Sequence, residues 1–266
     1  MGQGGEEILC RARESLMIHQ RSPLLVSAVA LDLDGTLVDT AEDIADAIDA
    51  ALVSLDLAPL GPAVVRGLIG QGFAHLVKSA LTCAAHGVEP TPELVGRAQL
   101  AVDREYTAGL SRRSVLYPGA QEGLDLLRTG GFPLACVTNK PKRFTTPLLE
   151  ALHLSRYFAL VIAGDTLAVK KPDPGQLIHA CHRLGTAPDR LLVVGDSIHD
   201  LHAARAAGCP VFCVTYGYTE DPAALARQAD AAVDSVAEVA VRIVRAESTP
   251  GFAPASGSGT DSGPEF

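Results

Sequence analysis

The chain has 266 residues, which is enough for one large α/β domain or for a core domain that carries a smaller inserted one. Its 31 acidic residues outnumber its 22 basic ones and give a net charge of −9, with no run rich in lysine and arginine, which argues against a general nucleic-acid-binding protein. Apolar residues make up 47% of the sequence, but no uncharged apolar stretch is long enough to span a membrane, so we expect a soluble protein.

The N-terminal segment, residues 1–22, lacks the continuous apolar run of a secretory signal peptide and is interrupted by Glu6, Glu7 and Glu14. We interpret it as an extension without chemistry of its own. The six cysteines of the chain form no CxxC pair, and several lie inside apolar runs, which is typical of reduced core residues. Both features favour a cytoplasmic location.

Short apolar runs alternate with helical patterns along most of the chain. Buried strands are predicted at Leu24–Leu31, Leu134–Val137, Leu160–Ala163, Leu191–Val194 and Val211–Val214. Helices are predicted between them, at Ala120–Arg128, Pro141–Leu152, Gln176–Leu184 and Ile198–Ala207. The alternation predicts an α/β fold with a doubly wound, Rossmann-like parallel sheet and helices on both faces.

The segment after the first strand breaks this alternation. Residues 40–116 show several helical patterns separated by turn signals, such as that at Gly70–Gly72, and no convincing strand. We interpret them as an all-helical domain inserted into a core that comprises residues 23–39 and 117–246. The last residues, 247–266, are rich in glycine, serine and proline and are predicted to be a disordered tail.

Polar residues follow four of the predicted strands. They are Asp32, Asp34, Gly35 and Thr36 after the first strand, Thr138, Asn139 and Lys140 after the second, Lys170 and Lys171 after the third, and Asp196 and Asp200 after the fourth. Because ligands of an open parallel sheet bind beyond the carboxyl ends of its strands, we expect these side chains to meet in one site. Several carboxylates in one pocket repel each other unless a cation lies between them, and oxygen ligands favour Mg²⁺.

The residue types in this site suit phosphoryl transfer. Mg²⁺ in proteins commonly combines one or two carboxylates with substrate phosphate oxygens. An aspartate such as Asp32 can attack phosphorus and carry the phosphoryl group as an aspartyl-phosphate. Thr138 and Lys171 would offer a hydroxyl and a positive charge to the phosphoryl oxygens.

Four motifs in a fixed order, DLDGT, VTN, KKP and GDSIHD, resemble the haloacid dehalogenase superfamily of phosphohydrolases over about Ala28–Val239. Further phrases, among them LIGQG, VTNKP and KKPDP, are similar to the bacterial phosphoglycolate phosphatase family. This resemblance implies a Mg²⁺-dependent phosphatase that hydrolyses a small phosphorylated metabolite, 2-phosphoglycolate, to glycolate and phosphate. One position departs from the superfamily, which often has asparagine where this chain has His199.

The resemblance also implies the catalytic and metal-binding residues. Asp32 would be the nucleophile and a Mg²⁺ ligand, and Asp34 the general acid and base, which binds the metal through its backbone carbonyl. Asp196 would complete the metal site, with Asp200 supporting it. Lys171 would pair with Asp32 and with the phosphate, and its neighbour Pro172 favours an extended backbone that lets the side chain reach inward.

The phosphate-binding residues implied by the resemblance are Gly35, Thr36, Thr138 and Asn139. The helical insert would be the cap that selects the substrate, because a lid over the site excludes water and contacts the leaving group. A second anion on the substrate needs a cation or several donors, and Arg66 and Gln71 in the cap are the candidates.

Other interpretations stay open at this stage. Thr138 could be the N-cap of the following helix, and Arg66 could be a surface charge. The activity could be that of a phosphatase for another small phosphate ester, of a phosphosugar mutase of the same superfamily, or of a non-catalytic binding protein. A dehalogenase is disfavoured because those relatives lack the second aspartate, Asp34. We expect a monomer or a homodimer.

Overall fold

The computed structural model describes residues 23–246. The expected N-terminal extension, residues 1–22, and the expected disordered tail, residues 247–266, lie outside the described residues. No helix within 23–246 combines the length and the apolar character needed to cross a bilayer.

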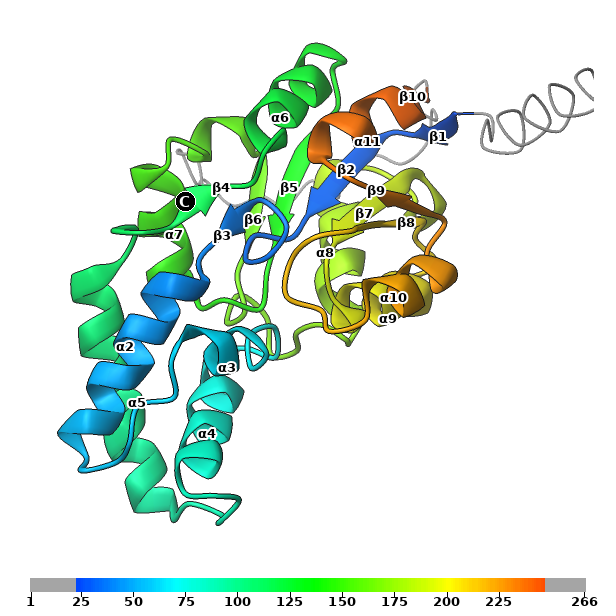
Figure 1. The fold of residues 1–266 in the computed structure, drawn as a ribbon. Helices are drawn as coiled ribbons and strands as arrows, with labels where there is room; N and C mark the ends of the chain where they lie inside the picture. Colours follow the sequence, from blue (N-terminus) through cyan, green and yellow to red (C-terminus); the bar gives the residue numbers. More distant parts are fainter. Residues whose placement is uncertain (1–22, 247–266) are drawn as a thin grey trace, which may run out of the picture.

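A six-stranded parallel sheet forms the centre of the fold (Figure 1). Its strands, in spatial order, are β6 (Leu160–Ile162), β5 (Leu134–Val137), β2 (Ala28–Leu31), β7 (Leu191–Gly195), β8 (Val211–Val214) and β9 (Ala231–Val233). Among the strands of this sheet, β2 comes first in the chain and lies in the middle, and later strands extend the sheet on both sides of it. This is the doubly wound topology, and the predicted fold class is confirmed.

Helices cover both faces of the sheet. One face packs against α6 (Ala120–Thr129), α7 (Lys142–Ala151) and α11 (Val236–Arg242), the other against α8 (Gly175–Leu184), α9 (Ile198–Ala207) and α10 (Pro222–Gln228). Successive residues of a strand point to opposite faces, so Val29 and Leu31 lie in the first core and Ala28 and Ala30 in the second. Strands buried on both faces are continuous apolar runs in sequence, which is why the pattern predicted them.

The run Leu24–Leu31 was predicted as one strand and is two. Residues Leu24–Val26 form β1, which pairs with β10 (Ile243–Arg245) in a separate two-stranded parallel sheet. The break falls at Ser27, whose backbone N–H donates to the carbonyl of Arg190, in the 3-10 turn η2 (Pro188–Arg190). The apolar run thus serves two different sheets.

Four helices lie within residues 40–116 and form their own apolar core: α2 (Ala41–Ser54), α3 (Pro62–Arg66), α4 (Phe73–Ala84) and α5 (Pro92–Gly109). Figure 1 shows them as a group beside the sheet. Phe144 of α7 belongs to the same apolar cluster, and its ring lies 4.9 Å from that of Tyr106, centroid to centroid. The helical segment is therefore packed onto the sheet domain through α7.

A short antiparallel ribbon joins the two ends of this helical segment. It consists of β3 (Val38–Asp39) and β4 (Val115–Leu116). The expectation of no strand within residues 40–116 was wrong for β4, because a strand of two residues is too short to produce an alternating pattern. The remaining short element is η1 (Ser155–Tyr157), which precedes β6.

Candidate active site

Three carboxylates converge at the carboxyl end of the central strands. Asp32 follows β2, Asp196 follows β7 and Asp200 lies in the first turn of α9, and one oxygen of each lies within 4.8 Å of the others. The convergence follows from strand register, because Leu31 and Val194 are paired neighbours in adjacent strands. The group is suited to a metal ion: it offers several hard oxygen ligands in one place.

Lys171 supplies the positive charge of this cluster. Its ammonium lies 3.0 Å from Oδ1 of Asp32 and 2.6 Å from Oδ1 of Asp200, and donates to the carbonyl of Val137 at 2.7 Å. The side chain is almost fully buried, and the peptide bond between Lys171 and Pro172 is cis. The structure therefore brings the ammonium of Lys171 to Asp32 and Asp200.

The two oxygens of Asp200 are both occupied by protein donors. Oδ1 binds Lys171, and Oδ2 accepts from the backbone N–H and the hydroxyl of Ser197, which in turn caps α9. Gly195 makes room for this carboxylate, since a Cβ there would lie 2.3 Å from its Cγ. Asp200 is thus built into the base of the site, consistent with a supporting position.

Asp196 is held by donors from two loops. Thr36 donates its hydroxyl to Oδ1 at 3.2 Å, and the backbone N–H of Tyr218 donates to Oδ2 at 2.8 Å. Gly35, at φ +84°, lies so close that a Cβ would be 2.3 Å from Oδ2. Thr36 is fully buried and its hydroxyl is used by Asp196, so the phosphate contact that the resemblance implies for Thr36 stays a prediction.

The cluster holds three carboxyl groups and one ammonium, so its negative charges are not fully compensated. Burial raises the pKa of Asp32 to about 7, with Asp200 adding to the rise and Lys171 opposing it. Burial, followed by the charges of Asp200 and Asp32, raises the pKa of Asp196 well above its usual range. Burial opposes the charge of Lys171, yet Asp200 and Asp32 raise the pKa of its ammonium. Carboxyl groups in this condition are stabilised as carboxylates by a bound cation.

Asp32 keeps one oxygen accessible for chemistry. Oδ1 accepts from the backbone N–H of Leu33 at 2.8 Å and pairs with Lys171. For Oδ2 the described part of the chain provides no hydrogen-bond donor, and the side chain is 12% exposed. A carboxylate oriented in this way has a free oxygen that can reach an incoming electrophile.

Asp34 points away from the acid cluster, toward the helical segment. Its Oδ1 accepts from the hydroxyl of Thr40 at 2.7 Å, and its two oxygens lie 3.0 and 3.2 Å from the ammonium of Lys140. That ammonium also donates to the hydroxyl of Tyr106 in α5, at 2.7 Å. Burial raises the pKa of Tyr106 to about 12, so its hydroxyl stays protonated at neutral pH.

Thr138 and Asn139 lie in the loop after β5. Thr138 is buried and accepts from the backbone N–H of Lys140; it is not the N-cap of α7, which is Pro141. The amide nitrogen of Asn139 donates to the carbonyls of Gly70 and Lys171, both at 2.9 Å. Its Oδ1 is buried without a hydrogen-bond partner. Asn139 therefore links the loops of the sheet to the helical segment and retains one unused acceptor.

The two residues predicted in the insert lie at different places. Arg66 donates to Asp39 and to the carbonyl of Gly217, both at 3.2 Å, and lies over the ring of Tyr218. It is therefore tied to the sheet domain rather than free on the surface. Gln71 is exposed, next to the Gly70 turn that Asn139 contacts.

Sequence reasoning missed the residues that surround Asp34. Lys140 was noted after the second strand but received no role, and Tyr106 and Tyr218 were not singled out. The hydroxyl of Tyr218 lies 2.7 Å from the backbone nitrogen of Thr40, which it accepts from. The only available signal was the position of Lys140 beside Thr138 and Asn139, since Tyr106 is one of several apolar residues spaced along a helix.

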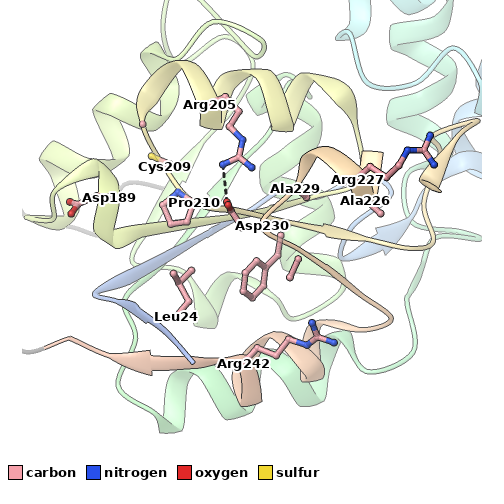
Figure 2. Close-up of a pocket in the computed structure, with 13 residues that line it drawn as sticks. Leu24, Asp189, Arg205, Cys209, Pro210, Ala226, Arg227, Ala229, Asp230 and Arg242 are labelled. Atoms are coloured by element: carbon pink, nitrogen blue, oxygen red, sulfur yellow. Dashed lines mark hydrogen bonds and ion pairs between the residues drawn. The ribbon is translucent and has the colours of Figure 1, made fainter. Parts of the chain in front are cut away.

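A large pocket of about 920 Å³ lies elsewhere, and Figure 2 shows its lining. Gly208, Cys209 and Pro210 border it, and they precede β8, so it opens at the amino ends of the strands. Its Arg205 pairs with Asp230 at 2.9 Å. Because ligands of such sheets bind at the carboxyl ends, this pocket is not the candidate active site.

Known proteins are similar to this chain over most of its length. A model of the haloacid dehalogenase-like hydrolase family matches residues 26–208. The phosphoglycolate phosphatase of Nitrosospira multiformis is 48% identical over 216 residues, which cover 81% of this chain and 95% of that protein. That of Thiobacillus denitrificans is 42% identical over 224 residues, or 84% and 98% of the two chains. The crystal structure of a predicted phosphoglycolate phosphatase from Haemophilus somnus is similar with a TM-score of 0.76 at 33% identity, and covers 80% of this chain and 96% of that one.

Proposed function

The chain belongs to the haloacid dehalogenase-like hydrolase family and is a phosphoric monoester hydrolase, and we propose that it hydrolyses 2-phosphoglycolate to glycolate and phosphate with Mg²⁺ as cofactor. The observation that carries the proposal is the buried group of Asp32, Asp196 and Lys171 at the carboxyl end of the sheet. The substrate is supported by the 48% identity to a phosphoglycolate phosphatase over most of the chain.

The residues of the site fit a magnesium ion. We propose that Asp32, Asp196 and the backbone carbonyl of Asp34 hold it, and that Asp200 supports them, since both oxygens of Asp200 already have protein donors. The fit rests on hard oxygen donors and on two carboxyl groups whose pKa values are raised by burial and by their acidic neighbours. When bound, Mg²⁺ supplies positive charge that offsets the repulsion between these acids and the substrate phosphate.

The reaction proceeds in two displacements at phosphorus. In the first, Oδ2 of Asp32 attacks phosphorus, the bond to the ester oxygen breaks, and Asp34 gives that oxygen a proton, so that glycolate leaves. In the second, Asp34 takes a proton from water, the water oxygen attacks phosphorus, and the bond to Asp32 breaks. Phosphate is released, and both aspartates return to their starting states.

The phosphoryl oxygens need donors while their charge is redistributed. We propose that Lys171 and the loop Thr138–Asn139 supply them, because Lys171 already lies 3.0 Å from the nucleophile. Gly35 and Thr36 act through Asp196: the glycine leaves space for its carboxylate, and the threonine hydroxyl orients it.

The helical segment is proposed as the cap, with the boundaries 40–116 and the core at 23–39 and 117–246. Its contact through the Gly70 carbonyl and Asn139 places the turn that carries Gln71 beside the loop of the phosphate site. Arg66 and Gln71 remain its proposed substrate-facing residues, although Arg66 would have to share its guanidinium with Asp39. We further propose a cytoplasmic enzyme that is a monomer or a homodimer.

The test is a panel of small phosphate esters incubated with the protein, with and without Mg²⁺. The proposal predicts phosphate release that requires Mg²⁺ and is fastest for 2-phosphoglycolate. No release from any ester contradicts the phosphatase activity, and a faster reaction with another ester contradicts the substrate. Phosphate that stays on an isomerised sugar product instead indicates a mutase.

A further inference from the structure

Lys140 is a buried cation that the proposed reaction leaves without a role. Its side chain is only 4% exposed, and its ammonium faces both oxygens of Asp34 and the hydroxyl of Tyr106. It also lies 4.7 Å from the centre of the Tyr106 ring. Lys171 serves the other aspartate, Asp32, so the two aspartates of the DLDGT motif have separate lysines.

A small pocket opens beside this ammonium. It has a volume of about 40 Å³ and lies between the start of α7 and the helical segment. Lys140 and Tyr106 provide its polar groups, and the remaining lining is apolar or glycine, including Ile69, Phe73 and Phe144. Such a pocket accepts only a few atoms, and its walls are almost entirely apolar, with Lys140 as the one cationic residue in its lining.

The position of Asp34 determines which part of the substrate lies close to this pocket. To pass a proton to the ester oxygen, Asp34 must lie within hydrogen-bond distance of that oxygen. Atoms attached to the ester oxygen therefore lie near Asp34, and the ammonium of Lys140 is 3.0 Å from Oδ1 of this aspartate. A carboxylate carried on the carbon next to the ester oxygen is only two bonds away, about 1.5 Å each, and so comes within range of the ammonium.

We propose that Lys140, with the Tyr106 hydroxyl as a second donor, is the specificity-determining group that binds the carboxylate of a short leaving group, a phosphorylated 2-hydroxy acid. The inference rests on the proposed function and deepens it by assigning the second anion of the substrate. The hydroxyl of Tyr106 accepts from Lys140 and so keeps its own proton for donation to the carboxylate. A sugar leaving group has no anion for Lys140 and is too large for the pocket as it stands.

The test compares two substrates of the same chain length, 2-phosphoglycolate and ethyl phosphate, which lacks the carboxylate. In Lys140→Met, we expect kcat/KM for 2-phosphoglycolate to fall about 100-fold, the scale of losing one partner of a buried charge pair. For ethyl phosphate we expect a smaller loss, of about tenfold, because the variant removes the contact of Lys140 with Asp34 but no ion pair with the leaving group. The control is Lys142→Met, at an exposed lysine two residues further on, where α7 begins, and both rates should match those of the wild type.

An equal loss on both substrates overturns the inference, because Lys140 would then act on Asp34 alone. A wild type that shows no preference for 2-phosphoglycolate over ethyl phosphate also overturns it. If Lys140→Met does not fold by circular dichroism, Tyr106→Phe takes its place: a loss confined to 2-phosphoglycolate supports the inference, and an equal or absent loss contradicts it. Failure of the wild type to hydrolyse 2-phosphoglycolate is a separate result, which contradicts the proposed function itself.

Discussion

The ammonium of Lys171 lies 3.0 Å from Oδ1 of Asp32, although 138 intervening positions of sequence separate a loop after β6 from the end of β2. The pair is nearly excluded from solvent, and the same ammonium holds Asp200. One cation thus orients the proposed nucleophile and fixes the carboxylate beneath it.

Lys171→Met is expected to lower both activity and stability. Removing the cation leaves Asp32 and Asp200 buried without a charge partner, which costs about 3 kcal/mol of unfolding free energy. Turnover should fall by at least about 100-fold, because a donor to the transferring group is lost. Lys170→Met is the matched control, since this neighbour is not part of the cluster. Similar activity losses in the two variants, measured by phosphate release, would contradict the assignment of Lys171.

Mg²⁺ is expected to stabilise the folded protein through Asp196. A ligand at 100 times its dissociation constant adds about 2.7 kcal/mol to the free energy of unfolding. The wild type should therefore show a higher Tm with Mg²⁺ than with a chelator, and Asp196→Asn should not. A Tm increase of equal size in the variant would place the ion elsewhere.

The metal-free protein is expected to lose stability as pH rises. In the folded state the pKa of Asp32 is raised from 3.8 to about 7, so the folded state holds its proton more tightly than the unfolded chain does. The corresponding stability is complete below pH 4 and is lost as pH rises through about 7. Chemical denaturation in a chelator should give a lower free energy of unfolding at pH 8 than at pH 5.5. In Asp32→Asn this difference should shrink; an unchanged difference would contradict the assignment to Asp32.

Gly35→Ala is expected to lower stability by more than the backbone strain of an alanine at this position would cost. Its φ of +84° carries a strain of about 1–2 kcal/mol for alanine, and the added Cβ would also meet Oδ2 of Asp196 at 2.3 Å. Gly208→Ala is the control, since Gly208 has φ +76° with nothing within 4 Å of its Cβ position. Gly35→Ala should lose more stability than the control and should lose the Mg²⁺-dependent rise in Tm. Equal losses would show that Asp196 adapts to the added methyl group.

The sequence predicted the sheet because its strands are apolar on both faces and are bounded by polar residues. It did not resolve β1 from β2, because the change of partner at Ser27 leaves the apolar run unbroken. It also missed β9, whose three residues include two alanines. Strands this short form because of the strands they pair with, and a local sequence pattern holds no information about those partners.

The acid cluster was predictable because strand ends meet at one edge of a parallel sheet. The environment of Asp34 was not, because Lys140 and Tyr106 come from different parts of the fold, 34 positions apart. The placement of Arg66 against Asp39 and Gly217 is likewise a product of how the helical segment packs on the sheet domain. Apolar patterns along the sequence do not show how one segment packs against another.

The most direct test of the account is to ask whether Asp32 carries the phosphoryl group. The protein is mixed with 2-phosphoglycolate labelled in its phosphate and with Mg²⁺, the reaction is quenched in acid during turnover, and the peptides are mapped. The account predicts label on the peptide that contains Asp32, and neither label nor turnover in Asp32→Asn. Turnover by Asp32→Asn at the wild-type rate, or label on a different residue, would contradict it.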